Sequence, residues 1–109
     1  MDYKRKVIIK RPDEKYGHMT NISTSLENLQ KIVEGYIEMV PLTSEPHVVM
    51  ICNDEGKIRR LQPSFFFGHV IRDMVCGTVV IAGADEEGEL TDIPISFSTW
   101  KMLLQKWGN

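Results

Sequence analysis

The residues of this chain that could do chemistry are two cysteines, three histidines and a number of carboxylates. Cys52 or Cys76 could act as a nucleophile if a histidine base and an orienting carboxylate lay beside it. His47 or His69, together with Asp73, would complete such a set. None of these residues lies in a nucleophile elbow or in a protease-type cysteine motif. A small hydrolase is therefore the weakest of the functions that we consider.

The same residues do not follow the spacing of a metal site. His18, His47 and His69 are scattered along the chain, whereas structural zinc sites pair their ligands closely. The Asn-Asp-Glu-Gly turn at 53–56 lacks the alternating oxygen ligands of a calcium loop. We therefore expect no metal and no cofactor. Both cysteines lie in apolar stretches, which predicts reduced thiols unless their two strands pair and allow a disulfide.

Length and composition indicate one globular domain. A chain of 109 residues, 42% of them hydrophobic and 26% charged, can bury a core of its own. The net charge is -2, and neither half of the chain is basic, so we expect no nucleic-acid partner. The N-terminal segment is charged, and the apolar runs are far shorter than the ~20 residues of a membrane span. We therefore expect a cytoplasmic protein with no membrane contact.

Two helices are predicted. The first starts at a capping box formed by Thr24 and Glu27 and ends at Gly35, which we expect in the left-handed conformation. Its apolar stripe consists of Leu26, Leu29, Ile32 and Val33. The second covers 97–107 with Ser96 as N-cap. Its apolar stripe consists of Phe97, Trp100, Leu103, Leu104 and Trp107.

The strand signals are weaker. Strands are predicted at 5–10, 36–40, 47–52, 57–61 and 78–82, a surface loop at 13–22, and no defined element at 65–76. The run at 47–52 is almost entirely apolar, which is typical of a strand buried on both faces. This order predicts an α+β fold in which residues 1–109 form one domain. We expect a mixed sheet of about four to five strands with two helices packed on one face.

Three places are candidates for binding. Phe65, Phe66 and Phe67 cannot all face one core in an extended chain, and an exposed aromatic residue is a good interface anchor. Tyr36 shares a strand face with Glu38 and could line a groove. The turn at Gly77 and Thr78 could border a pocket for a nucleotide-like ligand, although the glycine spacing there does not match a phosphate-binding loop.

Three strings, at 26–38, 51–57 and 77–85, together resemble the family catalogued as domain of unknown function 3846. The resemblance covers roughly residues 4 to 92. Such proteins occur in Gram-positive bacteria, their phages and their mobile elements. The resemblance therefore implies an accessory protein of a phage, plasmid or integrated element, and it implies no chemistry. The Phe65–Phe67 run and the segment after Leu90 depart from what the resemblance leads us to expect.

These observations favour a binding module that docks onto another protein, with a homodimer as a further expectation. A small-molecule binder for a nucleotide-like ligand is the alternative, followed by the small hydrolase. The candidate binding residues are Phe65, Phe66, Phe67, Tyr36, Gly77 and Thr78.

Overall fold

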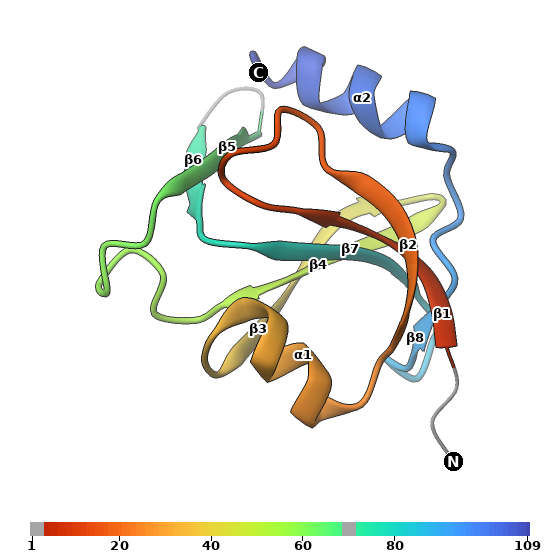
Figure 1. Ribbon diagram of the computed structural model, residues 1–109. Helices are drawn as coiled ribbons and strands as arrows, with labels where there is room; N and C mark the ends of the chain where they lie inside the picture. Colours follow the sequence, from red (N-terminus) through yellow and green to blue (C-terminus); the bar gives the residue numbers. More distant parts are fainter. Residues whose placement is uncertain (1–3, 69–71) are drawn as a thin grey trace.

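A six-stranded sheet, a separate two-stranded hairpin and two helices make up the computed structural model, which describes residues 4–68 and 72–109 (Figure 1). The elements in chain order are β1 Lys4–Lys10, β2 His18–Ser23, α1 Leu26–Val33, β3 Ile37–Ser44, β4 His47–Asn53, β5 Pro63–Phe67, β6 Asp73–Cys76, β7 Val79–Ala84, β8 Leu90–Thr91 and α2 Phe97–Lys106. The α+β class is therefore confirmed.

The main sheet has the strand order β2-β1-β7-β4-β3, with β8 pairing β7. Ile81 in the central strand β7 pairs with Ile8 of β1 on one side and with Met50 of β4 on the other. The strands number six rather than four to five, and every pairing among the described residues is antiparallel rather than mixed. Two unpredicted strands raise the count: β2, in a segment expected to be a loop, pairs antiparallel with β1, and the short β8 pairs with β7.

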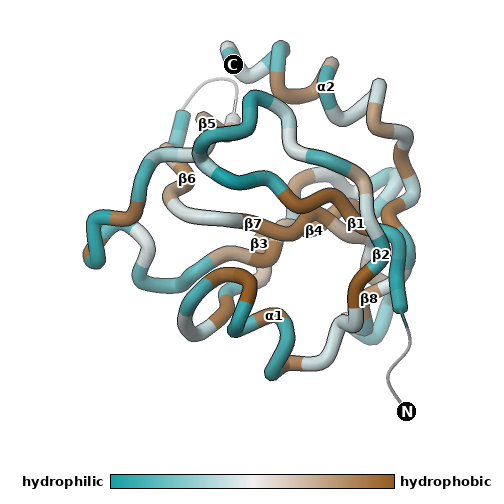
Figure 2. Tube along the Cα trace, viewed as in Figure 1, coloured by the Kyte–Doolittle hydropathy of each residue, from teal (hydrophilic) through white to brown (hydrophobic). Residues whose placement is uncertain are grey.

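The two helices cover opposite faces of the sheet, so the expectation of both on one face was wrong (Figure 1). Trp100 and Leu104 of α2 pack on one face, and Leu29 and Val33 of α1 pack on the other. Side chains alternate along a strand, and most of β4 and β7, together with residues 7–9 of β1, are hydrophobic (Figure 2). Both faces of the sheet are therefore apolar, and each is shielded from solvent by one of the helices. In the described part of the chain, neither helix is long and apolar enough to cross a membrane.

The caps of α1 differ from the expected ones by one residue. Ser25 rather than Thr24 is the N-cap, and its hydroxyl accepts from the Asn28 amide at 3.2 Å. Glu34 rather than Gly35 takes the left-handed conformation, with φ 64. Position 35 instead requires glycine because there is no room for a side chain: a Cβ there would lie 2.7 Å from the side-chain amide nitrogen of Asn53.

Helix α2 begins where it was expected and holds the hairpin to the sheet. The hydroxyl of Ser96 accepts from the Thr99 amide at 3.1 Å, which confirms the predicted N-cap. Trp100 is fully buried, and its indole nitrogen donates to the carbonyl of Tyr16 at 2.8 Å. Trp107 stacks on Phe65 of β5, with ring centroids 6.4 Å apart. The helix therefore joins the sheet, the 11–17 loop and the hairpin into one core.

The segment after β4 is a series of turns rather than the return strand predicted at 57–61. The Asn53 side chain accepts from the Glu55 amide at 2.8 Å and donates to the carbonyl of Val33 at 3.0 Å. The amide of Arg59 then donates to the carbonyl of Glu55 at 2.8 Å, which coils the backbone. The 65–76 region, for which no element was assigned, contributes to β5 and β6, with residues 69–71 outside the description.

Candidate functional site

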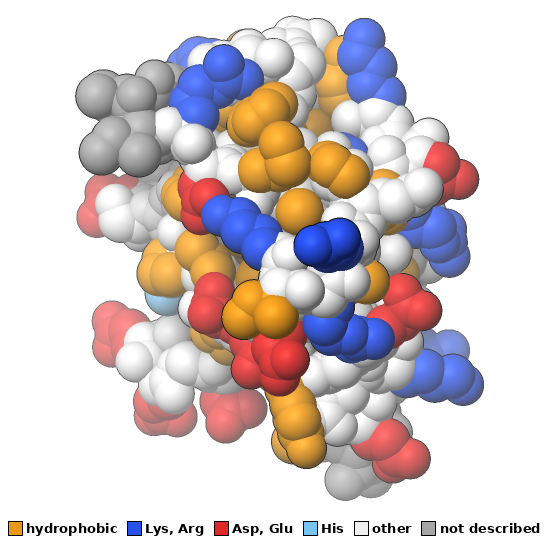
Figure 3. All heavy atoms as spheres, turned by 90° about the vertical axis from the view of Figure 1, so that its left-hand side faces the viewer, with side chains coloured by type: hydrophobic (Ala, Val, Ile, Leu, Met, Phe, Trp, Pro, Cys, Tyr) orange, Lys and Arg blue, Asp and Glu red, His pale blue; other side chains and the backbone are white. Residues whose placement is uncertain are grey.

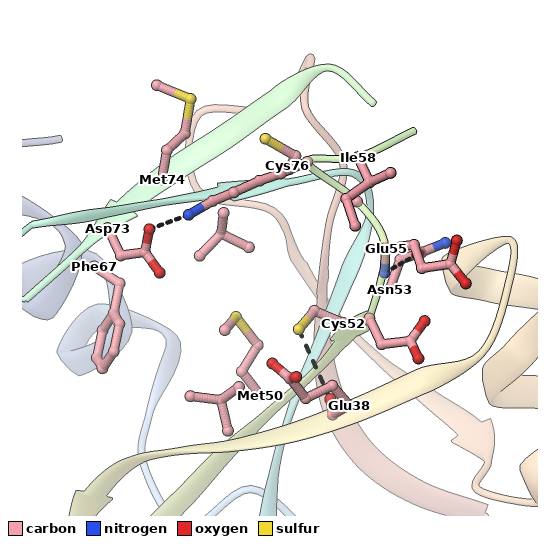
Figure 4. A pocket seen from close by; sticks show the side chains of 15 residues that line it. Glu38, Met50, Cys52, Asn53, Glu55, Ile58, Phe67, Asp73, Met74 and Cys76 are labelled. Carbon is pink, nitrogen blue, oxygen red and sulfur yellow. Dashed lines mark hydrogen bonds and ion pairs between the residues drawn. The ribbon is translucent and has the colours of Figure 1, made fainter. Parts of the chain in front are cut away.

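A pocket of about 400 Å³ lies between the main sheet and the β5–β6 hairpin (Figure 4). The turn at 54–58 closes one end of it. This face of the molecule carries apolar side chains gathered between acidic and basic ones (Figure 3). The pocket is lined by Glu38, Val40, Met50, Cys52, Asn53, Asp54, Glu55, Gly56, Lys57, Ile58, Phe67, Asp73, Met74, Val75 and Cys76.

The floor of the pocket is apolar. Met50 and Cys52 project from β4 toward the hairpin, because alternate residues of a strand share one face (Figure 4). Phe67 and Val75 come from the inner side of the hairpin, which also carries Phe65. Met74 points away from the floor (Figure 4). An apolar group entering between sheet and hairpin would therefore meet hydrocarbon and sulfur on both sides.

The rim of the pocket is mostly acidic. The carboxylates are Glu38, Asp54, Glu55 and Asp73, and the single cation of the lining is Lys57. The ammonium of Lys57 donates to the carboxylate of Asp73 across the mouth. This hydrogen bond lowers the pKa of Asp73 and raises the pKa of Lys57. Within residues 4–68 and 72–109, no lysine or arginine forms an ion pair with the other three carboxylates.

Cys52 is held as a neutral thiol. Its side chain is 7% exposed, and the sulfur donates to the carbonyl oxygen of Glu38 at 3.7 Å. Burial, and then the negative charges of Glu38 and Asp54, raise the pKa of this thiol to about 11. A nucleophilic cysteine needs the opposite environment, because the thiolate is the reactive form. Cys52 and Cys76 are both free, and their strands do not pair, so the condition for a disulfide is not met.

We predict that iodoacetamide at pH 8 modifies Cys76 and leaves Cys52 unmodified in the folded protein. Cys76 is half-buried, whereas Cys52 is buried and its pKa is about 11. At pH 8 only about one in a thousand Cys52 groups is a thiolate, so the reactive form of this residue is nearly absent. Peptide mapping by mass spectrometry, with a urea-unfolded sample as control, reports both sites. Equal labelling of the two cysteines in the folded protein would contradict this assignment.

Among the described residues, no histidine lies in the pocket with the two cysteines. Cys52, Cys76 and Asp73 line the same pocket, but His47 lies at the other end of β4. The five steps along the strand from position 47 to position 52 span about 17 Å. His69 lies outside the described residues. His18 instead contacts the Glu14 carboxylate at 2.8 Å. The described part of the chain also holds no group of three or more His, Cys, Asp or Glu residues that could bind a metal ion.

The three phenylalanines have three different environments. Phe65 is 4% exposed and belongs to the core. Phe67 is half-buried and lines the pocket. Phe66 points to the outer side of the hairpin, where it is 36% exposed beneath the guanidinium of Arg72, 4.5 Å from the ring centre. Asn109 holds the backbone of Phe66 with two hydrogen bonds of 2.8 Å.

The other three candidates lie around the pocket rather than in it. Tyr36 is 70% exposed and borders a second hollow, which shares the 53–55 turn with the pocket and also contains Arg59. Gly77 follows the pocket residue Cys76 and has φ +88; a Cβ there would lie 2.9 Å from a methyl carbon of Leu61. Thr78 lines neither hollow.

Sequence reasoning missed Met50, Lys57 and Ile58 as members of a site. A signal was present in the 57–60 segment, where Ile58 is an apolar residue with Lys57 before it and two arginines after it. The structure leaves its side chain 81% exposed at the pocket rim. The strand prediction for 57–61 obscured this isolated apolar residue, because a strand would have placed its side chain on one face of a sheet.

Comparison with known proteins places the chain in a family. Neither the curated proteins nor the solved structures contain a match to this chain. A family model covers residues 4–104, which confirms the resemblance and extends it beyond Leu90 into α2. The chain therefore belongs to the family described as Domain of unknown function (DUF3846).

Proposed function

We propose that this protein is a binding module that docks onto another protein through the pocket between β4 and the β5–β6 hairpin. The observation that carries the proposal is an apolar floor next to Ile58, whose side chain is 81% exposed. An apolar side chain that extends into solvent beside a hydrophobic pocket is a typical interface anchor. We further propose that docking takes place in the cytoplasm and serves a phage or mobile element, which the family resemblance supports.

Docking fits the chemistry of the pocket better than catalysis does. The pKa of the Cys52 thiol is raised to about 11, which disfavours the thiolate that a nucleophile needs. Lys57, the one cation in the lining, is paired with Asp73. What the pocket offers is apolar surface, hydrogen-bond acceptors and negative charge, and these are features that recognise a partner.

A nucleotide-like ligand, the alternative function, matches the size of the pocket but not its charge. A volume of about 400 Å³ is within the range of small-molecule sites. A phosphate group, however, would face Glu38, Asp54 and Glu55, with Lys57 already neutralised by Asp73. Like charges in a partly desolvated site oppose binding. We therefore rank this ligand below a protein partner, with a second copy of the chain as one such partner.

Replacing Ile58 with glutamate is expected to lower partner binding at least tenfold without unfolding the domain. The charge would sit at the centre of the proposed interface, where desolvation of a carboxylate opposes association. The measurement is native mass spectrometry on protein purified gently from its own host, in which the wild type should carry the extra mass of a whole protein.

Met102→Glu is the matched control, because Met102 is also an exposed apolar side chain, at 57%, but lies on α2 and not in the pocket lining. It should leave the partner bound, and circular dichroism should show both variants folded. Retention of the partner by Ile58→Glu would sink the proposal. Extra mass of only a few hundred daltons on the wild type would favour the small-molecule function instead.

A further inference from the structure

We propose that the group of the docked partner that enters the pocket is a basic side chain, with its alkyl stem on the apolar floor and its cation at the acidic rim. This inference rests on the proposed function and names the chemistry of the partner. Lysine and arginine combine an apolar stem with a charged end, and they bury the stem while keeping the charge at a polar boundary. The pocket offers both environments within one cavity.

The floor supplies the surface for the stem. Val40 on β3 and Met50 on β4 lie on the sheet side, and Phe67 and Val75 lie on the hairpin side. The cavity of about 400 Å³ between them has room for such a chain. Met50 is 2% exposed and forms the bottom of the cavity, so the half-buried Val40 and Phe67 supply the accessible apolar surface.

The rim supplies the negative charge. Glu38 comes from β3, Asp54 and Glu55 from the turn after β4, and Asp73 from β6, so carboxylates from three separate elements surround one apolar floor (Figure 4). Asp73 already forms an ion pair with Lys57. In the described residues, no cationic side chain forms an ion pair with the other three carboxylates of the rim. Glu38 and Asp54 also act electrostatically on the Cys52 thiol, which places their field inside the pocket.

The carboxylates of the rim therefore favour the binding of a cation and oppose the binding of an anion. An entering ammonium or guanidinium would meet Glu38 or Asp54 without having to displace an existing ion pair. An entering carboxylate would face the same groups at like charge. Charge complementarity thus selects a basic, apolar-stemmed side chain over a purely apolar or an acidic one.

The test compares three probes that share one alkyl chain: hexylammonium, hexanol and hexanoate, at pH 7 and low salt. Binding is followed by the methyl signals of the methionines in the NMR spectrum, with Met50 in the pocket and Met102 on α2 as the internal control. We expect the shifts to concentrate on Met50 and Met74, the two methionines of the pocket lining, and to leave Met102 unchanged. Hexylammonium should bind about two- to fivefold tighter than hexanol, the range for partly exposed charge pairs. Hexanoate should bind more weakly than hexanol, and added salt should shrink both differences.

Two variants locate the charge effect. Glu38→Gln should reduce the preference for hexylammonium over hexanol, whereas Glu45→Gln should leave it unchanged, because Glu45 lies at the opposite end of the β3–β4 hairpin. Equal affinity for the three probes, a preference for hexanoate, or no movement of Met50 with any probe would overturn the inference. Those results would leave docking itself to be decided by Ile58→Glu. Conversely, a cation preference with unchanged docking in Ile58→Glu would sink the docking function and retain the pocket chemistry.

Discussion

Replacing Phe65 with alanine is expected to lower the free energy of unfolding by about 3 to 5 kcal/mol. Phe65 is 4% exposed and packs edge-on against Trp100, with ring centroids 5.8 Å apart. It also stacks on Trp107 at 6.4 Å. Truncation would leave a cavity at the junction of hairpin and α2, where the surrounding rings cannot easily close together. Urea unfolding followed by tryptophan fluorescence and circular dichroism measures the loss.

The adjacent residue is the matched control. Phe66→Ala should change the free energy of unfolding by no more than about 1 kcal/mol, because Phe66 is 36% exposed on the outer side of the same strand. What it loses is mainly the contact with Arg72. Similar losses of unfolding free energy in the two variants would mean that Phe65 and Phe66 do not point to opposite sides of β5. The comparison also separates a structural role of the aromatic run from a binding role.

Lys10→Met is expected to lower the free energy of unfolding by about 2 to 3 kcal/mol. Lys10 is 1% exposed, and its ammonium donates to the carbonyls of Glu14 and Ser64, each at 2.7 Å. Methionine matches the length of the lysine stem but leaves these acceptors without a donor, and an unsatisfied buried polar group costs about 1 to 3 kcal/mol. Burial lowers the pKa of Lys10, so the ammonium itself is desolvated. Lys10→Met also removes the cost of desolvating the ammonium. The expected loss in the free energy of unfolding is therefore smaller than the summed cost of the two unsatisfied carbonyls.

Lys6→Met in the same strand provides the comparison. Its side chain is exposed, and the change should stay within about 0.5 kcal/mol. Chemical denaturation at pH 7 gives both values. A Lys10→Met protein as stable as the wild type would show that the desolvation of the buried ammonium outweighs its hydrogen bonds. In that case the ammonium of Lys10 would add no net stability to the attachment of the 11–17 loop and β5.

Much of the fold could be predicted from hydrophobic patterns, but the placement of the helices could not be derived from the helices themselves. The stripes of α1 and α2 show that each helix has one buried side, not which face of the sheet it covers. The apolar run at 47–52 did carry that information, because a strand buried on both faces requires cover on both faces. The strand β2 was missed because His18–Ser23 is mostly polar and its pairing with β1 is a tertiary interaction.

The candidate site was predictable only in part. Phe67 and the neighbourhood of Gly77 were among the binding candidates, and both lie at or beside the pocket. The pocket itself depends on the β5–β6 hairpin facing β4, which sets Asp73 opposite Lys57. No local signal specifies that arrangement, since the two residues come from different segments and meet through the packing of Phe65 and Val75 on the core.

The position of β1 within the sheet has a consequence for synthesis of the chain. Ile8 pairs with Ile81, and 81 minus 8 is 73 residues of separation. At the usual rates of translation, about 4 to 15 s pass between the appearance of these two residues. During that time β1 has β2 but not β7 as a neighbour in the sheet, and Ile8 lacks the cover that α2 later provides. The nascent chain, rather than the finished domain, is therefore the species most exposed to aggregation and most dependent on chaperones at the ribosome.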